Sequence, residues 1–188
     1  MLTLGSGNLG SGADWNKLSL DAAGWAADQT KYGKIGTVTL MHSNSASDIV
    51  FNNYAAKTGS SGDFEYNITA TPSMPFPTRT LTTDVTAEVN RFQNADATAD
   101  NVTGTAVYGG YSSLGNTTTN NKIKITNTNN TNLNVYGGYT AGDGNATNNH
   151  VTITATGKVK AAYGGYATAA DSKAEDNTVT VETGGWVD

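Results

Sequence analysis

Three short stretches in the second half of the chain alternate apolar β-branched residues with polar ones. Each stretch begins with an asparagine, and successive stretches start 28 residues apart. An alternation with a period of two predicts β-strands that bury one face and expose the other. A fixed spacing of roughly 20 to 50 residues predicts one supersecondary unit stacked on copies of itself, since a single unit cannot bury its apolar face alone. The three stretches are Asn121–Thr126, Asn149–Thr154 and Asn177–Glu182.

A second marker, the tetrapeptide Tyr-Gly-Gly-Tyr, keeps nearly the same spacing. Its copies, Tyr108–Tyr111, Tyr136–Tyr139 and Tyr163–Tyr166, start 28 and 27 residues apart. Together the two markers predict a unit of strand, turn, second short strand, Gly-Gly corner and polar loop. The glycines are expected to permit either a corner with positive φ or a close backbone approach between coils. One tyrosine of each pair is expected to pack in or against the core, and the other to form an external ladder.

Three architectures hold a repeat made only of strands and turns: a parallel β-solenoid, a propeller and an open meander. A propeller blade needs about four strands in roughly 40–45 residues, which is more than this unit has. The pattern therefore predicts an all-β fold, a parallel β-solenoid with about 28 residues per coil. Like residues of successive coils would stack about 4.8 Å apart, and the asparagine side chains would form a hydrogen-bonded ladder. The predicted columns are Ile123, Val151 and Val179; Ile125, Ile153 and Val181; and Asn121, Asn149 and Asn177.

Residues 1–100 lack the repeat and are predicted to form irregular β-structure, either degenerate coils or a cap over the open end of the solenoid. Residues 101–188 are predicted to form three solenoid repeats. A short helix is an alternative for Ser19–Gln29, and the prolines of Thr71–Pro77 predict an exposed loop or a boundary. The strand candidates of this half are Leu2–Leu4, Ile35–Met41, Asp48–Phe51, Phe64–Ile68 and Leu81–Val85.

The C-terminal residues begin a further repeat, because Gly185–Asp188 follows its strand as Gly157–Lys160 follows the preceding one. A fourth tetrapeptide is due shortly afterwards, and natural solenoids usually end in a capping element. The sequence is therefore expected to be a fragment of a longer repetitive protein, cut within a repeat.

Composition narrows the functions that this fold could carry. The chain has no cysteine, 14% charged residues and a net charge of −5. The lack of cysteine excludes disulfides and thiolate metal sites, and the acidic balance disfavours nucleic-acid binding, which needs clustered Lys and Arg. No run approaches the roughly 18–20 apolar residues of a membrane span. We therefore expect no nucleic-acid partner and no membrane span in this fragment.

Candidate catalytic groups are few. His42 has no partner that the sequence identifies, and His150 takes the outward position that Lys122 and Thr178 hold in the other repeats. The turn Gly142–Asn145 resembles a calcium-binding turn, but it occurs in one repeat only. The closest acidic pairs of the N-terminal half give no sign of the facing carboxylates that glycoside hydrolysis needs; they are Asp63 with Glu65 and Asp84 with Glu88. The sequence therefore predicts no enzyme, no cofactor and no metal site.

The repeat resembles that of a known family. Val-Tyr-Gly-Gly-Tyr, a loop of Gly, Asn, Ala and Thr, then Asn-x-Val-Thr-Ile-Thr and a Gly-x-Val turn are similar to repeats in the passenger domains of bacterial autotransporters, the type V secreted surface adhesins. The resemblance covers Asn101–Asp188. It implies a right-handed β-helix, exported through an outer-membrane barrel to the bacterial cell surface, where such passengers serve cell adhesion and virulence.

The leading hypothesis is a non-enzymatic, extracellular adhesin or stalk fragment that contacts a host or bacterial surface protein or glycan. An alternative is a glycan-binding or glycan-cleaving β-helix, in which Tyr108, Tyr136 and Tyr163 form a ladder of ligand contacts. A further alternative is a surface filament, in which the open end of one chain pairs end to end with the N-terminal strand of another copy.

Overall fold

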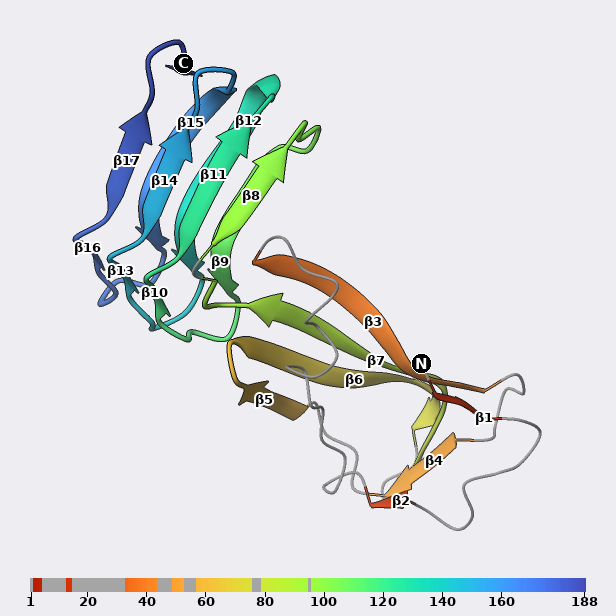
Figure 1. Cartoon of the computed structure of the whole chain (residues 1–188). Coiled ribbons are helices and arrows are strands. Elements are labelled where there is room, and N and C mark those ends of the chain that lie inside the picture. Colours follow the sequence, from red (N-terminus) through yellow and green to blue (C-terminus); the bar gives the residue numbers. More distant parts are fainter. Residues whose placement is uncertain are drawn as a thin grey trace.

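The chain forms two connected β-structures, a solenoid and a twisted sheet that extends away from it (Figure 1). The structure is a computed structural model, and it describes residues 2–4, 13–14, 33–43, 49–52, 57–75, 79–94 and 96–188 of the 188-residue chain. Every regular element within these ranges is a β-strand, which confirms the prediction of an all-β fold. The alternative helix, Ser19–Gln29, lies outside the described residues.

Three parallel sheets wind around the solenoid, and successive coils add one strand to each in turn. The first sheet contains β8 (Ala97–Asp100), β11 (Lys122–Thr126), β14 (His150–Ile153) and β17 (Thr178–Val181). The tyrosine sheet contains β9 (Ala106–Ser112), β12 (Asn129–Thr140), β15 (Lys158–Ala167) and β18 (Trp186–Val187). The short sheet contains β10 (Thr118–Thr119), β13 (Ala146–Thr147) and β16 (Ala174–Glu175).

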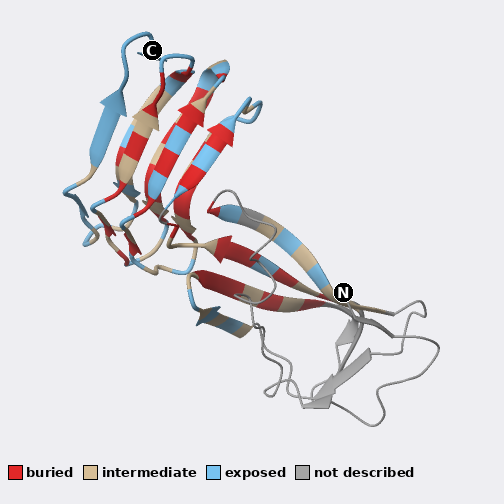
Figure 2. Ribbon diagram, in the orientation of Figure 1, coloured by how far each residue is buried: buried red, intermediate tan, exposed pale blue. Residues whose placement is uncertain are grey.

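The first sheet has the register that the sequence predicts. Val151 pairs with Ile123 on one side and with Val179 on the other, and Ile153 likewise pairs with Ile125 and Val181. The apolar side chains of β11 and β14 are buried, and burial of each contributes about 1.5–3 kcal/mol. Figure 2 shows the resulting bands of buried and exposed residues along these strands. The parallel β-solenoid with about 28 residues per coil is therefore confirmed.

The stack also includes β8, which precedes the first tetrapeptide. Ala97 pairs with Ile123 and Ala99 with Ile125, and both alanines are buried in the solenoid core. Alanine in place of isoleucine makes this coil a poor match to the Asn-led pattern, so its strand is hard to recognise from the repeat alone.

The predicted Gly-Gly corner is wrong. Each tetrapeptide lies inside one continuous strand, β9, β12 or β15, and the second short strand and the tyrosines belong to that same strand. The polar loop that was expected to follow contains a two-residue strand of the short sheet. Two residues are too few to show an alternation of apolar and polar positions, so the pattern could not reveal them.

The corner between the short sheet and the first sheet instead lies one residue before each ladder asparagine. Asn120, Asn148 and Asp176 have φ values of 56°, 53° and 55°. Asn and Asp adopt this left-handed conformation more readily than other residues with a side chain. The paired Asn-Asn and Asp-Asn sequences thus combine a corner residue with a ladder residue.

The N-terminal residues form a seven-stranded sheet of different topology. Its strands are β1 (Leu2–Leu4), β2 (Ala13–Asp14), β3 (Lys34–Ser43), β4 (Ile49–Asn52), β5 (Lys57–Ser61), β6 (Phe64–Pro75) and β7 (Arg79–Arg91). The long strand β7 pairs antiparallel with β3, β4 and β6. Strands β1 and β2 pair parallel with β3 and β4, so this sheet is mixed, unlike the all-parallel sheets of the solenoid.

Strand β6 contradicts the loop that was predicted at Thr71–Pro77. It runs through Pro72 to Pro75, with register shifts against β7 on either side of Pro72, while residues 76–78 lie outside the description. Its partner on the other side, β5, reaches only as far as Ile68. No described strand pairs with the proline segment on the β5 side, and a residue without a backbone N–H is tolerated at such an edge.

The N-terminal sheet packs against the first coil of the solenoid (Figure 1). The backbone N–H of Gly33 donates to the carbonyl oxygen of Tyr108 at 2.8 Å, and the N–H of Arg91 donates to the carbonyl of Gly33 at 2.6 Å. A Cβ on Gly33 would lie 2.5 Å from the backbone nitrogen of Tyr111, so only glycine fits this contact. The N-terminal sheet therefore contacts the solenoid at β9 of its first coil.

Candidate functional site

The six tyrosines of the tetrapeptides form two parallel ladders on the outside of the tyrosine sheet. Rings of the first ladder, Tyr108, Tyr136 and Tyr163, stack with centroid distances of 5.1 and 5.0 Å and interplanar angles of 13° and 10°. Rings of the second ladder, Tyr111, Tyr139 and Tyr166, stack at 5.3 and 5.4 Å with angles of 9° and 7°. None of the six side chains is buried. One tyrosine of each pair was expected to pack in or against the core and only the other to form an external ladder; this expectation is wrong, because both columns form ladders on the outside.

Both tyrosines point outward because the two glycines between them both face the interior. In β12, Val135 is buried, Tyr136 is partly exposed, Gly137 and Gly138 are both buried, and Tyr139 is partly exposed again. Two consecutive inward residues shift the alternation by one position. The second tyrosine therefore returns to the face that the first occupies.

Close approach between coils explains why these positions require glycine. A Cβ on Gly109 would lie 2.5 Å from the carbonyl oxygen of Gly137 in the next coil, and a Cβ on Gly138 would lie 2.5 Å from the amide nitrogen of Asn149. None of the six tetrapeptide glycines has a positive φ. Of the two expected reasons, a positive φ is therefore not observed, and close backbone approach between coils accounts for Gly109 and Gly137; the second glycine of each pair instead makes room for an asparagine side chain.

The asparagine ladder lies directly beneath the second glycines and is confirmed. Nδ2 of Asn121 donates to Oδ1 of Asn149 at 2.8 Å, and Nδ2 of Asn149 donates to Oδ1 of Asn177 at 3.0 Å. Each acceptor oxygen also receives the backbone N–H of the preceding asparagine, at 3.0 and 2.9 Å. Asn121 and Asn149 are fully buried, so the ladder satisfies polar groups that water cannot reach.

The stacking decides which part of each tyrosine a ligand could touch. Rings of the same coil meet edge to face, at 4.8 Å for Tyr108 with Tyr111 and at 5.4 Å for Tyr136 with Tyr139. In the middle coil, both faces of Tyr136 and of Tyr139 lie against rings of the neighbouring coils, which leaves hydroxyl groups and ring edges for solvent. The predicted contact residues Tyr108, Tyr136 and Tyr163 thus present a row of phenol hydroxyls, and only the two end rings have a face without a described ring stacked on it.

Partial burial raises the pKa of Tyr108, Tyr111 and Tyr136 above the ordinary value of a phenol, and neighbouring tyrosines raise it further. The hydroxyl groups therefore keep their protons over the whole physiological pH range and can both donate and accept hydrogen bonds.

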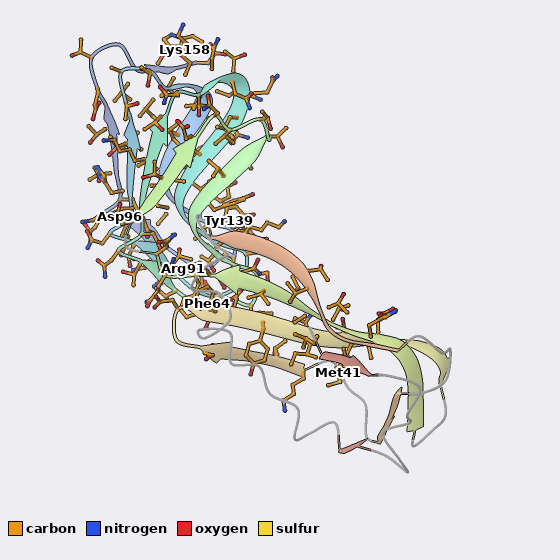
Figure 3. All side chains as sticks on the ribbon, turned by 45° about the vertical axis from the view of Figure 1, so that its right-hand side comes forward. Met41, Phe64, Arg91, Asp96, Tyr139 and Lys158 are labelled. Atoms are coloured by element: carbon orange, nitrogen blue, oxygen red, sulfur yellow. The ribbon has the colours of Figure 1, made fainter. Side chains whose placement is uncertain are left out.

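Lys34 of the N-terminal sheet lies over the ring of Tyr111, with Nζ 5.3 Å from the centroid, and adds a cation at this end of the ladders. Figure 3 shows Tyr139 on the side of the solenoid near the bend towards β3.

The candidate acid and base residues have separate partners. Nδ1 of His42 lies 2.7 Å from Oδ1 of Asp84, a cross-strand contact between β3 and β7 that sequence spacing did not reveal. Asp63 lies 3.6 Å from the guanidinium of Arg91, near the junction with the solenoid (Figure 3). Glu88 is exposed, and Glu65 is fully buried.

Glu65 is a residue whose importance the sequence did not show. Its carboxylate receives hydrogen bonds from Asn90 in β7 and from three residues of the first coil. The donors are Asn90 Nδ2 at 3.2 Å, Ser112 Oγ at 2.6 Å, Ser113 N and Oγ at 2.6 and 3.1 Å, and Asn116 Nδ2 at 2.8 Å. A buried carboxylate is stable only with such donors. Glu65 therefore fastens the N-terminal sheet to the solenoid, over a sequence separation that local motifs cannot bridge.

The described residues contain no group of three or more His, Asp or Glu side chains arranged to hold a metal ion. No described helix has the length and apolar character that crossing a membrane would need.

Comparisons with known protein families, with curated proteins and with solved structures found no match. The likeness to autotransporter passenger domains therefore stays a prediction from the repeat.

Proposed function

We propose that the chain is a non-enzymatic stalk segment of a bacterial surface adhesin, with a role in extension and contact outside the cell. The observation that carries this proposal is the register-matched stack of coils from β8 to β17, in which each outer face repeats the same positions at strand spacing. Such a solenoid lengthens by adding coils without changing its cross-section. A protein that projects a contact surface away from a cell needs this property.

The interactions between coils suit a part that bears load. Backbone hydrogen bonds connect neighbouring coils in all three sheets, and the asparagine and tyrosine ladders add further contacts in the same direction. The buried carboxylate of Glu65 ties the N-terminal sheet to the coil at one end. These connections act together along the solenoid axis, so a pull along it is shared among many hydrogen bonds.

The exposed tyrosine ladders supply a contact surface for this role. Tyr163 and Tyr166 are 39% and 40% exposed, and tyrosine is enriched in protein interfaces because it has a large apolar body and a polar tip. A surface protein or a glycan on a host or bacterial cell is the proposed partner. Repetition of the tyrosines in three successive coils would allow several weak contacts to act at once.

Attachment of beads coated with the chain to epithelial and bacterial cells tests this proposal. Beads carrying the folded chain should attach saturably, and soluble chain should compete with them. Beads carrying the variant Ile153→Asp, which is expected to lose the solenoid, are the matched control. Equal attachment of the two kinds of bead, or no attachment to any cell type, would contradict the adhesin role.

A further inference from the structure

An open groove lies on the outside of the solenoid where the short sheet turns into the first sheet. It has a volume of about 600 Å³ and spans three coils. Its lining consists of two corner residues and the first residues of three strands, namely Asn120, Asn148, Lys122, His150 and Thr178. None of these side chains belongs to the core, to the asparagine ladder or to the tyrosine ladders.

The corner geometry brings two columns of polar side chains to the same hollow. The left-handed conformation of Asn120 and Asn148 turns the chain so that their amides lie beside the outward side chains of β11 and β14. Nδ2 of Asn148 donates to Oδ1 of Asn120. This bond holds both amides in place, and no described residue bonds to the Nδ2 group of Asn120 or to Oδ1 of Asn148. One donor and one acceptor are thus available to a ligand.

The charge of the groove is opposite to that of the whole chain. Lys122 contributes a cation, the imidazole of His150 contacts the hydroxyl of Thr178, and no carboxylate lines the groove, although the chain has a net charge of −5. Among the described residues, the same two columns continue with carboxylates: Asp96 precedes Lys122 by one coil, and Asp176 follows Asn148 by one coil and lies two residues before Thr178. An anionic group therefore fits best beside Lys122 and His150, between these two carboxylates.

We propose that this groove binds an oligosaccharide that carries a carboxylate, such as a chain containing uronic acid. The sugar carboxylate lies against Lys122 and the imidazole of His150, because an ammonium group is a strong hydrogen-bond donor to an anion. The amides of Asn120 and Asn148 bind ring hydroxyls, for which a paired donor and acceptor are suited. All five lining side chains are polar, so hydrogen bonds and charge, more than apolar burial, set the selectivity. The groove proposal specifies the class of partner for the contact role proposed above, and it rests on that proposed role.

Binding of two matched β-1,4-linked probes to the whole chain tests the proposal. Cellouronate oligosaccharides carry a carboxylate on each residue, and cello-oligosaccharides of equal length have the same backbone without charge. Calorimetry should show that the chain binds cellouronate and that the neutral probe binds at least about tenfold more weakly, since one charge-assisted hydrogen bond accounts for that ratio. Lys122→Gln should weaken cellouronate binding by about the same factor.

Lys158→Gln is the control, because Lys158 is an exposed lysine on the tyrosine sheet, outside this groove. It should leave cellouronate binding unchanged, and thermal melts should show that both variants stay folded. Equal binding of the two probes, no binding of cellouronate, or equal losses in the two variants would overturn the proposal. If beads still attach to cells but cellouronate does not bind, only the groove proposal is refuted. If cellouronate binds but the beads do not attach, only the adhesin role is refuted.

Discussion

Asn149, at the centre of the asparagine ladder, offers a sharp test of how the coils are held together. Replacing it with Asp keeps the size and shape of the side chain but exchanges a donor group for an acceptor. Nδ2 of Asn149 donates to the carbonyl oxygen of Thr118 at 3.0 Å and to Oδ1 of Asn177 at 3.0 Å, in a site that is 1% exposed. In Asn149→Asp both bonds are lost, and a negative oxygen faces two acceptors.

The size of the effect follows from these contacts. Each lost hydrogen bond costs about 0.5–1.5 kcal/mol, and a buried acceptor left without a donor costs a further 1–3 kcal/mol or so. The total is about 2–6 kcal/mol, a large part of the 5–15 kcal/mol or so that stabilises a typical domain. The bonds that Asn149 accepts from Asn121 remain, so the loss concerns the donated bonds alone.

The neighbouring substitution Asn148→Asp is a matched control. Asn148 is an exposed corner residue with φ of 53°, and Asp176 occupies the equivalent corner one coil further on. The bond that its Nδ2 donates to Oδ1 of Asn120 is solvent-exposed, so water can replace it. The same chemical change there should alter the free energy of unfolding by no more than about 0.5 kcal/mol. Urea denaturation followed by circular dichroism measures both variants, and equal losses would refute the assignment of the ladder to Asn149.

The pH dependence provides a second check on the same variant. Burial opposite two acceptors should raise the pKa of the introduced carboxyl group above its unfolded value of about 3.9. The penalty is then full at neutral pH, and it shrinks as pH falls through the raised pKa, because the protonated group regains one donor. A penalty that stays constant from neutral to acidic pH would contradict this account.

Three further predictions concern the core, the junction and the tyrosines. Ile153→Asp should lower the free energy of unfolding by more than about 4 kcal/mol, because it places an unpaired charge in a fully buried column. Thr152→Asp, on the outward face of the same strand, should lower it by less than about 0.5 kcal/mol, and similar melting temperatures for the two variants would refute the register. In urea denaturation, Glu65→Gln should lower the free energy of unfolding by about 2–4 kcal/mol, because an NH₂ group would face hydrogen-bond donors. Asp63→Asn, at a surface ion pair, should lower it by less than about 1 kcal/mol, and the reverse order would exclude Glu65 as the residue that fastens the sheet to the solenoid. Alkaline titration of phenol absorbance should show a group that ionises above pH 10, and stability should fall as pH rises from about 10 through the raised pKa values, because only the unfolded phenols ionise readily there. A single ordinary transition would contradict the partial burial of Tyr108, Tyr111 and Tyr136.

The sequence predicted the solenoid correctly at positions where the same type of residue recurs in each coil for a single structural reason. The alternation around Ile153 and the 28-residue spacing of the asparagines gave both the columns and the ladder, since each depends only on strand period and coil stacking. Strand candidates in the N-terminal half, including Ile35–Met41 and Phe64–Ile68, also lie within strands. Their antiparallel partners could not be predicted, because without a repeat nothing in the local pattern fixes which strands pair.

The tyrosine ladders show why the same alternation failed at the tetrapeptide. A count of alternate residues from Val135 places Tyr136 outside and Tyr139 inside, and it would be right if Gly137 and Gly138 occupied opposite faces. Both glycines face inward because the backbone of the next coil meets the first and an asparagine amide meets the second. The asparagine ladder and the exposed tyrosine ladders are thus two sides of one arrangement. The buried amide needs the space that the second glycine leaves, and the paired glycines return the second tyrosine to the surface. We therefore expect a substitution at Gly138 to disturb both the asparagine ladder and the tyrosine ladders, although Gly138 faces the interior and the tyrosines lie on the outer surface.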